Sequence, residues 1–560
     1  MGIRIVLSGP SRLPSGLAIA LLVVAGLGLR LWRLGDASLW LDEAASVQFA
    51  GLPWSVLWLS GYDNAPPLYY SLLKLALRFG DSEAVIRLPS VLFGVLTIPL
   101  IYWAGRLIAG PRAGLTAALY LTLSAAHVEY SQEARGYSLL VLALAIALVG
   151  LLLLLTQRRF TRSAASTWPV RQPGVAGLAL YASGILVALY TNNIAVIFVF
   201  VAQLAFVYHW VMRAGCDRTL AAHWLLTNGL VFLLWLPWLH VVLTQLLGDG
   251  SMAWLAQPSA TKAARIWSHV IGFGYIGLGR PWFNLALCLL FLYGAFRLRR
   301  QPSVALLLLC VAILGPFLVW LVGFLHPLYM DRTIIWSLLG SALLAGAGID
   351  AMQGWKVTAL ILAMAVLAAS SVVTYHATGA AENSDWRTGY AAWQRGLASD
   401  ASAQAAIFCS PPAVLPILYY ARHRTALPPL LAWGAGAHGE GTALILDRST
   451  TVADPGRRDW LAQVPHDLYL WKRGAADARK KLLPALPEQA RWRQPVWDRL
   501  DVTFAHAPSP IRSSMKAALD QAGWRPRESM RFNGKEIVSY ACTGDGCQLP
   551  GHVGPAVSSP

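Results

Sequence analysis

The feature that most constrains this chain is a series of apolar runs, each close to the length of a membrane span and separated by short polar turns. A helix needs about 20 apolar residues to cross a bilayer, and it satisfies its own backbone hydrogen bonds there. We therefore expect a polytopic α-helical membrane protein with about eleven transmembrane helices. The runs lie near residues 17–32, 88–104, 114–126, 137–155, 175–191, 194–211, 224–246, 282–296, 304–324, 334–348 and 357–375.

The composition agrees, because only 13% of the residues are charged, against about 25% in a soluble domain. The net charge of +17 does not point to nucleic acid, since the arginines lie in short loops between the apolar runs. Such loops are cytoplasmic in membrane proteins, and they alternate with loops that are poor in Lys and Arg. The arginine-bearing loops contain Arg106 and Arg112, Arg158 to Arg171, Arg213 and Arg218, and Arg297 to Arg300.

This charge pattern places the N-terminus in the cytoplasm, and it places two long segments outside. The first is the loop of residues 34–87, and the second is the tail of residues 376–560. The tail is polar and contains strand-like and helix-like stretches, so we expect a small extracytoplasmic α/β domain there. Strands are expected near residues 406–409, 444–447, 468–471, 502–505 and 537–540.

Two cysteines of the tail, Cys542 and Cys547, lie close together in a polar loop. In an extracytoplasmic domain they are candidates for a disulfide. Two unpaired thiols are the alternative interpretation.

The first extracytoplasmic loop carries two adjacent acids, Asp42 and Glu43, directly after the first apolar run. Residues 52–59 and 66–79 follow, and their apolar patterns predict helices lying in the membrane interface. A carboxylate held near hydrocarbon is costly unless it has a function or a partner. The alternative is that Asp42 only caps a short helix over residues 43–50.

Two further loops on the same predicted face carry charges. The loop of residues 129–137 contains Glu129, Glu133 and Arg135, and these residues are either functional or form an ion pair that ends two helices. In the loop of residues 326–332, Arg332 is suited to bidentate phosphate contact. Its alternative role is an arginine whose head group reaches the membrane surface.

Some common site types are excluded by the sequence. There is no GxxxxGK[ST] phosphate loop, no HExxH motif and no cluster of His and Cys with metal-ligand spacing. A phosphate group recognised by these loops would therefore arrive on a lipid within the membrane.

Four short segments together resemble the GT-C glycosyltransferases of the family that contains the protein O-mannosyltransferases and the lipid A aminoarabinose and galacturonic acid transferases. They are Leu41-Asp42-Glu43-Ala44, Pro66-Pro67-Leu68-Tyr69-Tyr70, Arg87-Leu88-Pro89-Ser90 with Gly94, and Tyr130-Ser131-Gln132-Glu133-Ala134-Arg135-Gly136-Tyr137. The resemblance covers roughly residues 15–375 and implies a GT-C transmembrane domain over residues 1–375, followed by the α/β domain over residues 376–560.

The resemblance also implies an activity and residue roles. Such enzymes transfer a sugar from a polyprenyl-phosphate donor to an acceptor hydroxyl, with inversion, on the extracytoplasmic face of a membrane, here the bacterial inner (plasma) membrane. The acceptor is a lipid, a polysaccharide or a protein. Asp42 is the expected general base, with Glu43 and Glu133 as further acids. Arg332, Tyr69 and Arg135 are candidates for the donor phosphate. A divalent cation is a candidate cofactor, with Asp42 and Glu133 as its candidate ligands.

A different class of function stays open, namely a transporter or flippase of a lipid-linked sugar, because charges at membrane depth also occur in transporters. The acids lie at one face and not at the midplane, and the chain shows no inverted repeat. Both observations favour the transferase.

Overall fold

Each predicted transmembrane run is helical in the computed structural model, which describes residues 15–59, 65–156, 173–247, 258–271, 280–325, 328–352, 355–379 and 385–398, and parts of 404–542. These helices are α1 (Ser15–Leu31), α5 (Glu83–Ala109), α6 (Pro111–Leu123), α8 (Tyr137–Leu155), α9 (Pro173–Leu189), α10 (Ala195–Met212), α11 (Arg218–Leu247), α13 (Arg280–Arg297), α14 (Pro302–Leu309) continuing to α15 (Gly315–Val322), α17 (Leu338–Asp350) and α18 (Trp355–Thr374).

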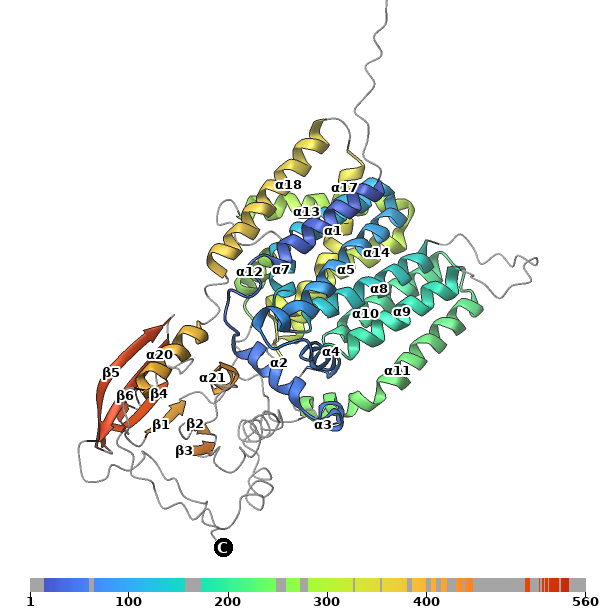
Figure 1. Ribbon diagram of the computed structural model, residues 1–560. Helices are drawn as coiled ribbons and strands as arrows, with labels where there is room; N and C mark the ends of the chain where they lie inside the picture. Colours follow the sequence, from blue (N-terminus) through green and yellow to red (C-terminus); the bar gives the residue numbers. More distant parts are fainter. Residues whose placement is uncertain are drawn as a thin grey trace, which may run out of the picture. The chain divides into compact units, whose positions relative to one another are not determined.

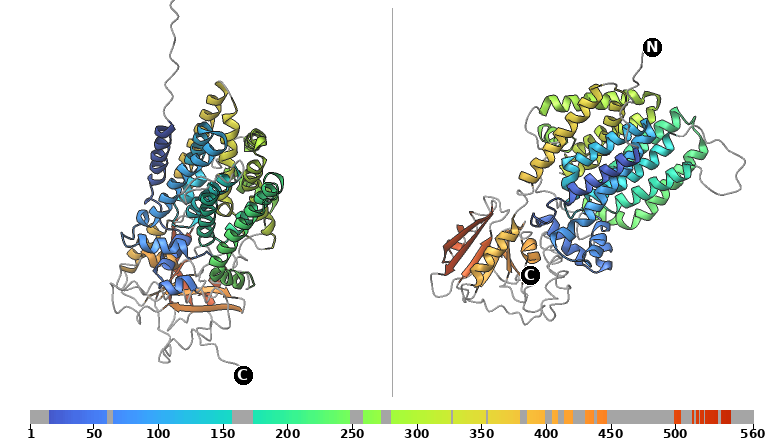
Figure 2. Two further views of the ribbon diagram at one scale, coloured as in Figure 1. Left: turned by 90° about the vertical axis from the view of Figure 1, so that its right-hand side faces the viewer. Right: turned by 45° about the horizontal axis from the view of Figure 1, so that its top comes forward.

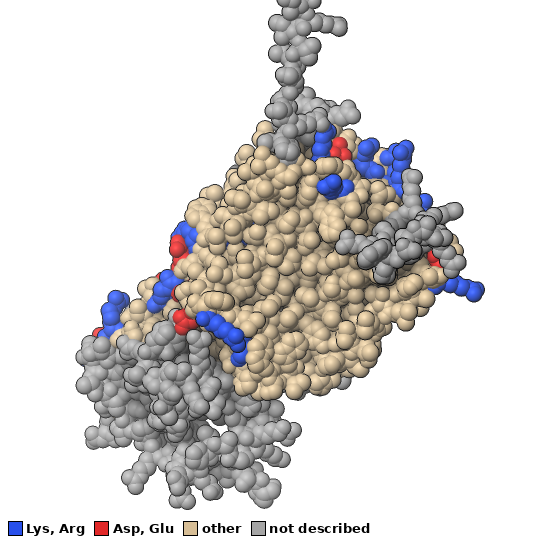
Figure 3. Space-filling view, turned by 45° about the vertical axis from the view of Figure 1, so that its right-hand side comes forward, with Lys and Arg blue, Asp and Glu red and all other residues tan. Residues whose placement is uncertain are grey.

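Several of these helices have the length and composition of a membrane span. Among the described residues, 6 helices are long and apolar enough to cross a bilayer, and shorter apolar helices cover Ser15–Leu31, Gly174–Leu189 and Ile361–Ala377. On the face shown in Figure 3, a broad band of the helical region carries few charged side chains. The protein is therefore a multi-pass membrane protein.

The described structure forms two compact units that do not follow chain order. Unit 1 comprises residues 1–34, 63–72 and 87–378, whereas unit 2 comprises residues 35–62, 73–86 and 379–560. The loop of residues 34–87 is thus shared between the units, and most of it groups with the C-terminal part of the chain.

Helix α8 lies at the centre of unit 1. It is apolar on all sides, and a helix of this kind has to be buried. Helices α9 and α10 pack beside it, as two views show (Figure 1 and Figure 2). Gly150 of α8 faces the backbone of Gly177 and Tyr181 on α9, where a β-carbon would collide. Small residues allow this close approach of helix backbones in membranes.

The third predicted span is broken in the structure. Helix α6 ends at Leu123, and a second helix, α7 (Ala125–Ser131), follows after Ser124. The buried Arg30 of α1 fills the break: its guanidinium group donates to the carbonyl oxygens of Leu121 (3.4 Å) and Thr122 (3.5 Å). The prediction of a loop over residues 129–137 is therefore only partly correct, because Glu129 belongs to α7.

Three arginine-bearing turns gather at one end of unit 1. The side chain of Gln301, in the turn between α13 and α14, donates to the carbonyl oxygen of Ile108 at 3.1 Å. Arg213, after α10, donates to the carbonyl oxygen of Arg300 at 3.2 Å. These turns thus form one basic end of the helical unit, which is the arrangement that the charge pattern predicts for the cytoplasmic side.

Unit 2 begins with the helices of the first loop. They are α2 (Leu41–Gly51), α3 (Trp54–Leu59) and the end of α4 (Leu68–Ala76). The helices predicted over residues 52–59 and 66–79 are present over residues 54–59 and 68–76, and their location in the membrane interface stays a prediction. The remainder of unit 2 contains α20 (Trp386–Ala398), α21 (Val414–Tyr420) and a mixed sheet.

Within the described part of the tail, the sheet has 6 strands in the order β3-β2-β1-β4-β6-β5. Strand β1 is parallel to β2 and β4, and the other pairs are antiparallel. The strands are β1 (Gln404–Phe408), β2 (Leu430–Gly436), β3 (Gly439–Leu446), β4 (Arg499–Thr503), β5 (Trp524–Phe532) and β6 (Lys535–Cys542). The predicted α/β character of the tail is confirmed, and β2 and β5 are additional strands.

Other expectations for the tail are less fully resolved. The strand expected at residues 468–471 and the residue Cys547 lie outside the described residues. Cys542 is disulfide-bonded, and its pairing with Cys547 stays a prediction.

Residues 434–439 read Gly-Ala-Gly-Ala-His-Gly, the spacing of a dinucleotide-binding motif. However, β2 and β3 pair antiparallel there, whereas that motif leads from a strand into a helix.

Candidate functional site

The turn between α7 and α8 is bonded to the start of α4 and to α5 within unit 1. Arg135 donates to the hydroxyl oxygen of Tyr70 at 3.0 Å, and Ser90 Oγ donates to the carbonyl oxygen of Arg135 at 3.2 Å. The hydroxyls of Ser90 and Tyr69 lie 2.8 Å apart. Three of the segments that carry the family resemblance therefore meet, and Tyr69 and Arg135 share Ser90 as a neighbour.

Tyr137, the first residue of α8, has both predicted phosphate arginines beside its ring. The guanidinium carbon of Arg135 lies 5.9 Å from the ring centroid, and that of Arg332 lies 6.0 Å from it. An aromatic face attracts a cation over this range, so the Tyr137 ring attracts both guanidinium groups. Planar guanidinium groups suit the recognition of a phosphate.

A third group of charges lies on α7, on α12 (Ala260–Ile271) and on α16 (Asp331–Ile334). His269 Nε2 is 3.5 Å from a carboxylate oxygen of Glu129 and 3.5 Å from one of Asp331. The Tyr329 hydroxyl donates to the Ala263 carbonyl of α12 at 3.4 Å, and burial together with the Asp331 carboxylate raises the pKa of Tyr329 to about 12.

His269 is a residue that the sequence did not single out. It lies on an amphipathic helix between predicted spans, and a lone histidine there carries no motif. In the folded chain it lies 3.5 Å from carboxylate oxygens of both Glu129 and Asp331. Asp331 directly precedes Arg332 in the sequence.

Glu133 is buried, with 7% of its surface exposed, in the turn that follows α7. The backbone of that turn is closed by a hydrogen bond from the amide of Arg135 to the carbonyl of Glu133 at 2.8 Å. Glu129, Glu133 and Asp331 all act electrostatically on Tyr130. The predicted acid therefore belongs to the same group of polar residues in unit 1 as His269.

Asp42 and Glu43 lie in unit 2, on the first turn of α2, and they differ from each other. Asp42 is half-buried, whereas Glu43 is only 1% exposed. The amide of Trp40 donates to Glu43 Oε2 at 3.4 Å. Since α2 begins at Leu41 with Trp40 as its cap residue, the alternative in which Asp42 caps a helix over residues 43–50 is wrong, and Glu43 is the acid that bonds the helix start.

The candidate metal ligands Asp42 and Glu133 belong to different units. Within the part of the chain that the structure describes, no three side chains of His, Cys, Asp or Glu form a group that could hold a metal ion. The metal stays a prediction from the resemblance.

Comparison with protein families gives one match. The family model described as dolichyl-phosphate-mannose-protein mannosyltransferase matches residues 64–170. This range contains the segments around Tyr69, Arg87 and Glu133 but not the one around Asp42. No curated protein sequence matches the chain significantly.

Comparison with solved structures extends the likeness to nearly the whole chain. ArnT from Cupriavidus metallidurans in the apo state matches with a TM-score of 0.57 and 12% sequence identity, over 94% of this chain and 98% of that one. ArnT from the same organism bound to undecaprenyl phosphate matches with a TM-score of 0.56 and 14% identity, over the same shares. The chain therefore has the GT-C fold of ArnT, and the resemblance predicted from the sequence is confirmed.

Proposed function

We propose that this protein is an integral-membrane glycosyltransferase, which moves a sugar from a polyprenyl-phosphate donor to an acceptor hydroxyl. The observation that carries the proposal is the pair Arg135 and Arg332 beside Tyr137, within a fold shared with a structure of ArnT bound to undecaprenyl phosphate. A polyprenyl phosphate presents the anionic group for which two arginines are suited.

The roles of the residues follow from the chemistry of such a donor. Its phosphate is a good leaving group, so catalysis requires stabilisation of the phosphate, removal of the acceptor proton and positioning of both reactants. Arg332 and Arg135 stabilise the negative charge of the phosphate. Tyr69 lies near Arg135, because its hydroxyl is hydrogen-bonded to Ser90, and Ser90 donates to the Arg135 carbonyl. Asp42 acts as general base in a direct displacement with inversion at the anomeric carbon. Positioning contributes about 7–11 kcal/mol to such reactions.

The supporting acids have narrower roles. Glu43 orders the start of α2, because its carboxylate accepts the Trp40 amide. Glu133 acts near the acceptor. If a divalent cation takes part, Asp42 and Glu133 are its candidate ligands, and turnover of purified protein after treatment with a chelator, with and without added cations, tests this.

The location belongs to the same proposal. We place the basic end of unit 1, formed by the end of α5 at Ile108 and the turns that contain Arg213 and Arg300, in the cytoplasm of a bacterium. The turn that carries Glu133 and Arg135, and the C-terminal domain, then lie on the extracytoplasmic side of the inner membrane.

The decisive experiment uses purified protein in lipid bilayers with a panel of polyprenyl phosphates that carry different radiolabelled sugars, and with lipid, polysaccharide and peptide acceptors. Transfer of label from one donor to one acceptor class supports the proposal. Movement of an intact labelled donor between leaflets, without cleavage of its sugar–phosphate bond, would replace the transferase by a flippase.

A further inference from the structure

Helix α2, which carries Asp42, is held at its C-terminal end by Lys74. The ammonium group donates to the carbonyl oxygens of Leu52 (2.6 Å) and Ala50 (3.2 Å). It also lies 5.5 Å from the ring centroid of Trp54. A cation at this end is favoured by the helix dipole and by the unpaired carbonyls of the last turn.

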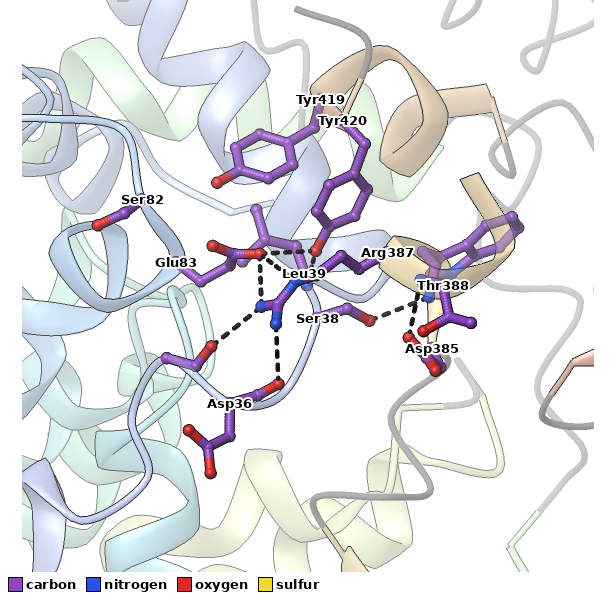
Figure 4. A network of polar contacts seen from close by, with 12 residues as sticks. Asp36, Ser38, Leu39, Ser82, Glu83, Asp385, Arg387, Thr388, Tyr419 and Tyr420 are labelled. Atoms are coloured by element: carbon purple, nitrogen blue, oxygen red, sulfur yellow. Dashed lines mark hydrogen bonds and ion pairs between the residues drawn. The ribbon is translucent and has the colours of Figure 1, made fainter. Parts of the chain in front are cut away.

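The N-terminal end of α2 is held by residues from the C-terminal part of the chain. The backbone amide of Leu39 donates to the hydroxyl oxygen of Tyr420, at the end of α21, over 2.8 Å. The Tyr420 hydroxyl in turn donates to Glu83 Oε1 at 3.1 Å. Figure 4 shows the Tyr420 hydroxyl and the Arg387 guanidinium group converging on the Glu83 carboxylate.

Arg387, near the start of α20, connects Glu83 to the segment before α2. Its guanidinium group lies 2.7 Å from Glu83 Oε1, and it donates to the carbonyl oxygens of Gly35 (3.0 Å) and Asp36 (3.4 Å). The next contact along the same segment is the amide of Trp386, which donates to Ser38 Oγ at 3.0 Å. The backbone from Gly35 to Leu39 is thus bonded at several points to α20 and α21 (Figure 4).

Helix α20 is itself anchored to the sheet of unit 2. Trp393 Nε1 donates to one carboxylate oxygen of Asp501 on β4 at 3.0 Å, and Ser539 on β6 donates to the other at 2.6 Å. Asp501 is only 1% exposed, and a buried carboxylate with these bonds is costly to displace. Contacts therefore run without interruption from the sheet to the start of α2.

A single exposed ion pair would do little to fix the segment before α2, since such pairs contribute about 0–1 kcal/mol to stability. Here the pair is part of a network with neutral partners. Burial, together with the Glu83 carboxylate, raises the pKa of Tyr420. Its hydroxyl therefore keeps its proton and donates to Glu83 at any physiological pH.

We propose that Arg387 and Tyr420 are positioning residues for α2, through which the C-terminal α/β domain fixes the orientation of Asp42. This inference rests on the proposed role of Asp42 as general base. It assigns to the C-terminal domain a part in the reaction without contact between that domain and the reacting atoms.

The test compares Arg387→Ala, Arg387→Lys and Tyr420→Phe with the parent protein in bilayers. Both kcat and the donor KM are measured, together with hydrogen exchange of the α2 backbone. The matched control is Arg531→Ala, which removes an exposed arginine of the same domain that pairs instead with Glu536 on the neighbouring strand (3.5 Å).

We expect Arg387→Ala to lower kcat by about 10- to 100-fold, since a displacement of about 1 Å has that effect. The donor KM should stay unchanged and exchange in α2 should rise, whereas Arg531→Ala should change neither. Tyr420→Phe removes one hydroxyl only, so it tests the same network if Arg387→Ala fails to fold.

Unchanged kcat, or unchanged exchange in α2, in both Arg387→Lys and Tyr420→Phe would overturn the positioning role. A parent protein without sugar transfer would instead reject the proposed function, and the exchange measurement would still show whether the network holds α2.

Discussion

Asp42 and Glu43 are neighbours in the sequence but occupy different environments, so their substitutions should have different effects. Asp42→Asn keeps the shape of a half-buried side chain and removes a base. We expect kcat to fall by about 10²–10⁴-fold with an unchanged melting temperature.

Glu43→Ala removes a buried carboxylate that accepts a hydrogen bond from the Trp40 amide, and we expect it to lower the free energy of unfolding by about 1 kcal/mol. Thermal unfolding and transfer assays on both variants separate the two roles. Normal turnover in Asp42→Asn would reject the base.

The arginines beside Tyr137 lead to a second prediction about single residues. Arg332→Ala removes a guanidinium group from the proposed phosphate site, so the donor KM should rise by about 10- to 100-fold, the range of hydrogen bonds to charged groups. The control is Arg299→Ala, since Arg299 also lies over an aromatic ring, that of Phe296 at 4.4 Å, but belongs to the basic end of unit 1. An equal rise in KM for both variants would mean that the effect comes from lost positive charge in general.

At the scale of elements, the break between α6 and α7 sets the direction of the turn that carries Glu133. Arg30 donates to the carbonyls at the end of α6, to Ser131 Oγ at 3.2 Å, and contacts His127 Nδ1 at 2.7 Å. Gly94 of α5 allows this, because a side chain there would collide with Ser131. Arg30→Met should cost on the order of 1–3 kcal/mol for each buried acceptor left without a donor.

Thermal unfolding in detergent measures this loss, and Arg30→Lys should fall between the parent and Arg30→Met, because an ammonium group has fewer donors. Equal melting temperatures for the parent and Arg30→Met would show that the break does not depend on Arg30.

The helical elements could be predicted because their apolar runs satisfy a strict requirement of length and hydrophobicity. The missed elements have weaker patterns. Strand β5 contains Arg525, Arg527 and Pro526, and it is an edge strand, where proline and charge are tolerated. Strand β2 is rich in glycine. Helix α12 buries only Ile266, Val270 and Ile271, so its stretch lacks the continuous apolar run of a span.

At the scale of the whole molecule, the sequence indicated which loops carry the candidate functional residues but not which side chains meet. The proximity of Arg135 to Tyr70, and of Arg332 to Tyr137, depends on how distant helices pack. The same holds for the grouping of residues 35–62 and 73–86 with the C-terminal part of the chain. Periodicity along the chain contains no information about such contacts, and His269 illustrates this, because only folding brings it between Glu129 and Asp331.

The orientation in the membrane is a property of the whole molecule, and native Cys216 offers a probe of it. Cys216 is an exposed free cysteine in the turn between α10 and α11, near Arg213 at the basic end of unit 1. If that end is cytoplasmic, a membrane-impermeant maleimide should label Cys216 only after lysis of the cells. The exposed position Arg395 on α20 provides the opposite probe, since Arg395→Cys should be labelled in intact spheroplasts. Cys216→Ser in both backgrounds identifies the labelled thiol. Labelling of Cys216 before lysis, with Arg395→Cys protected, would invert the orientation and place the proposed site in the cytoplasm.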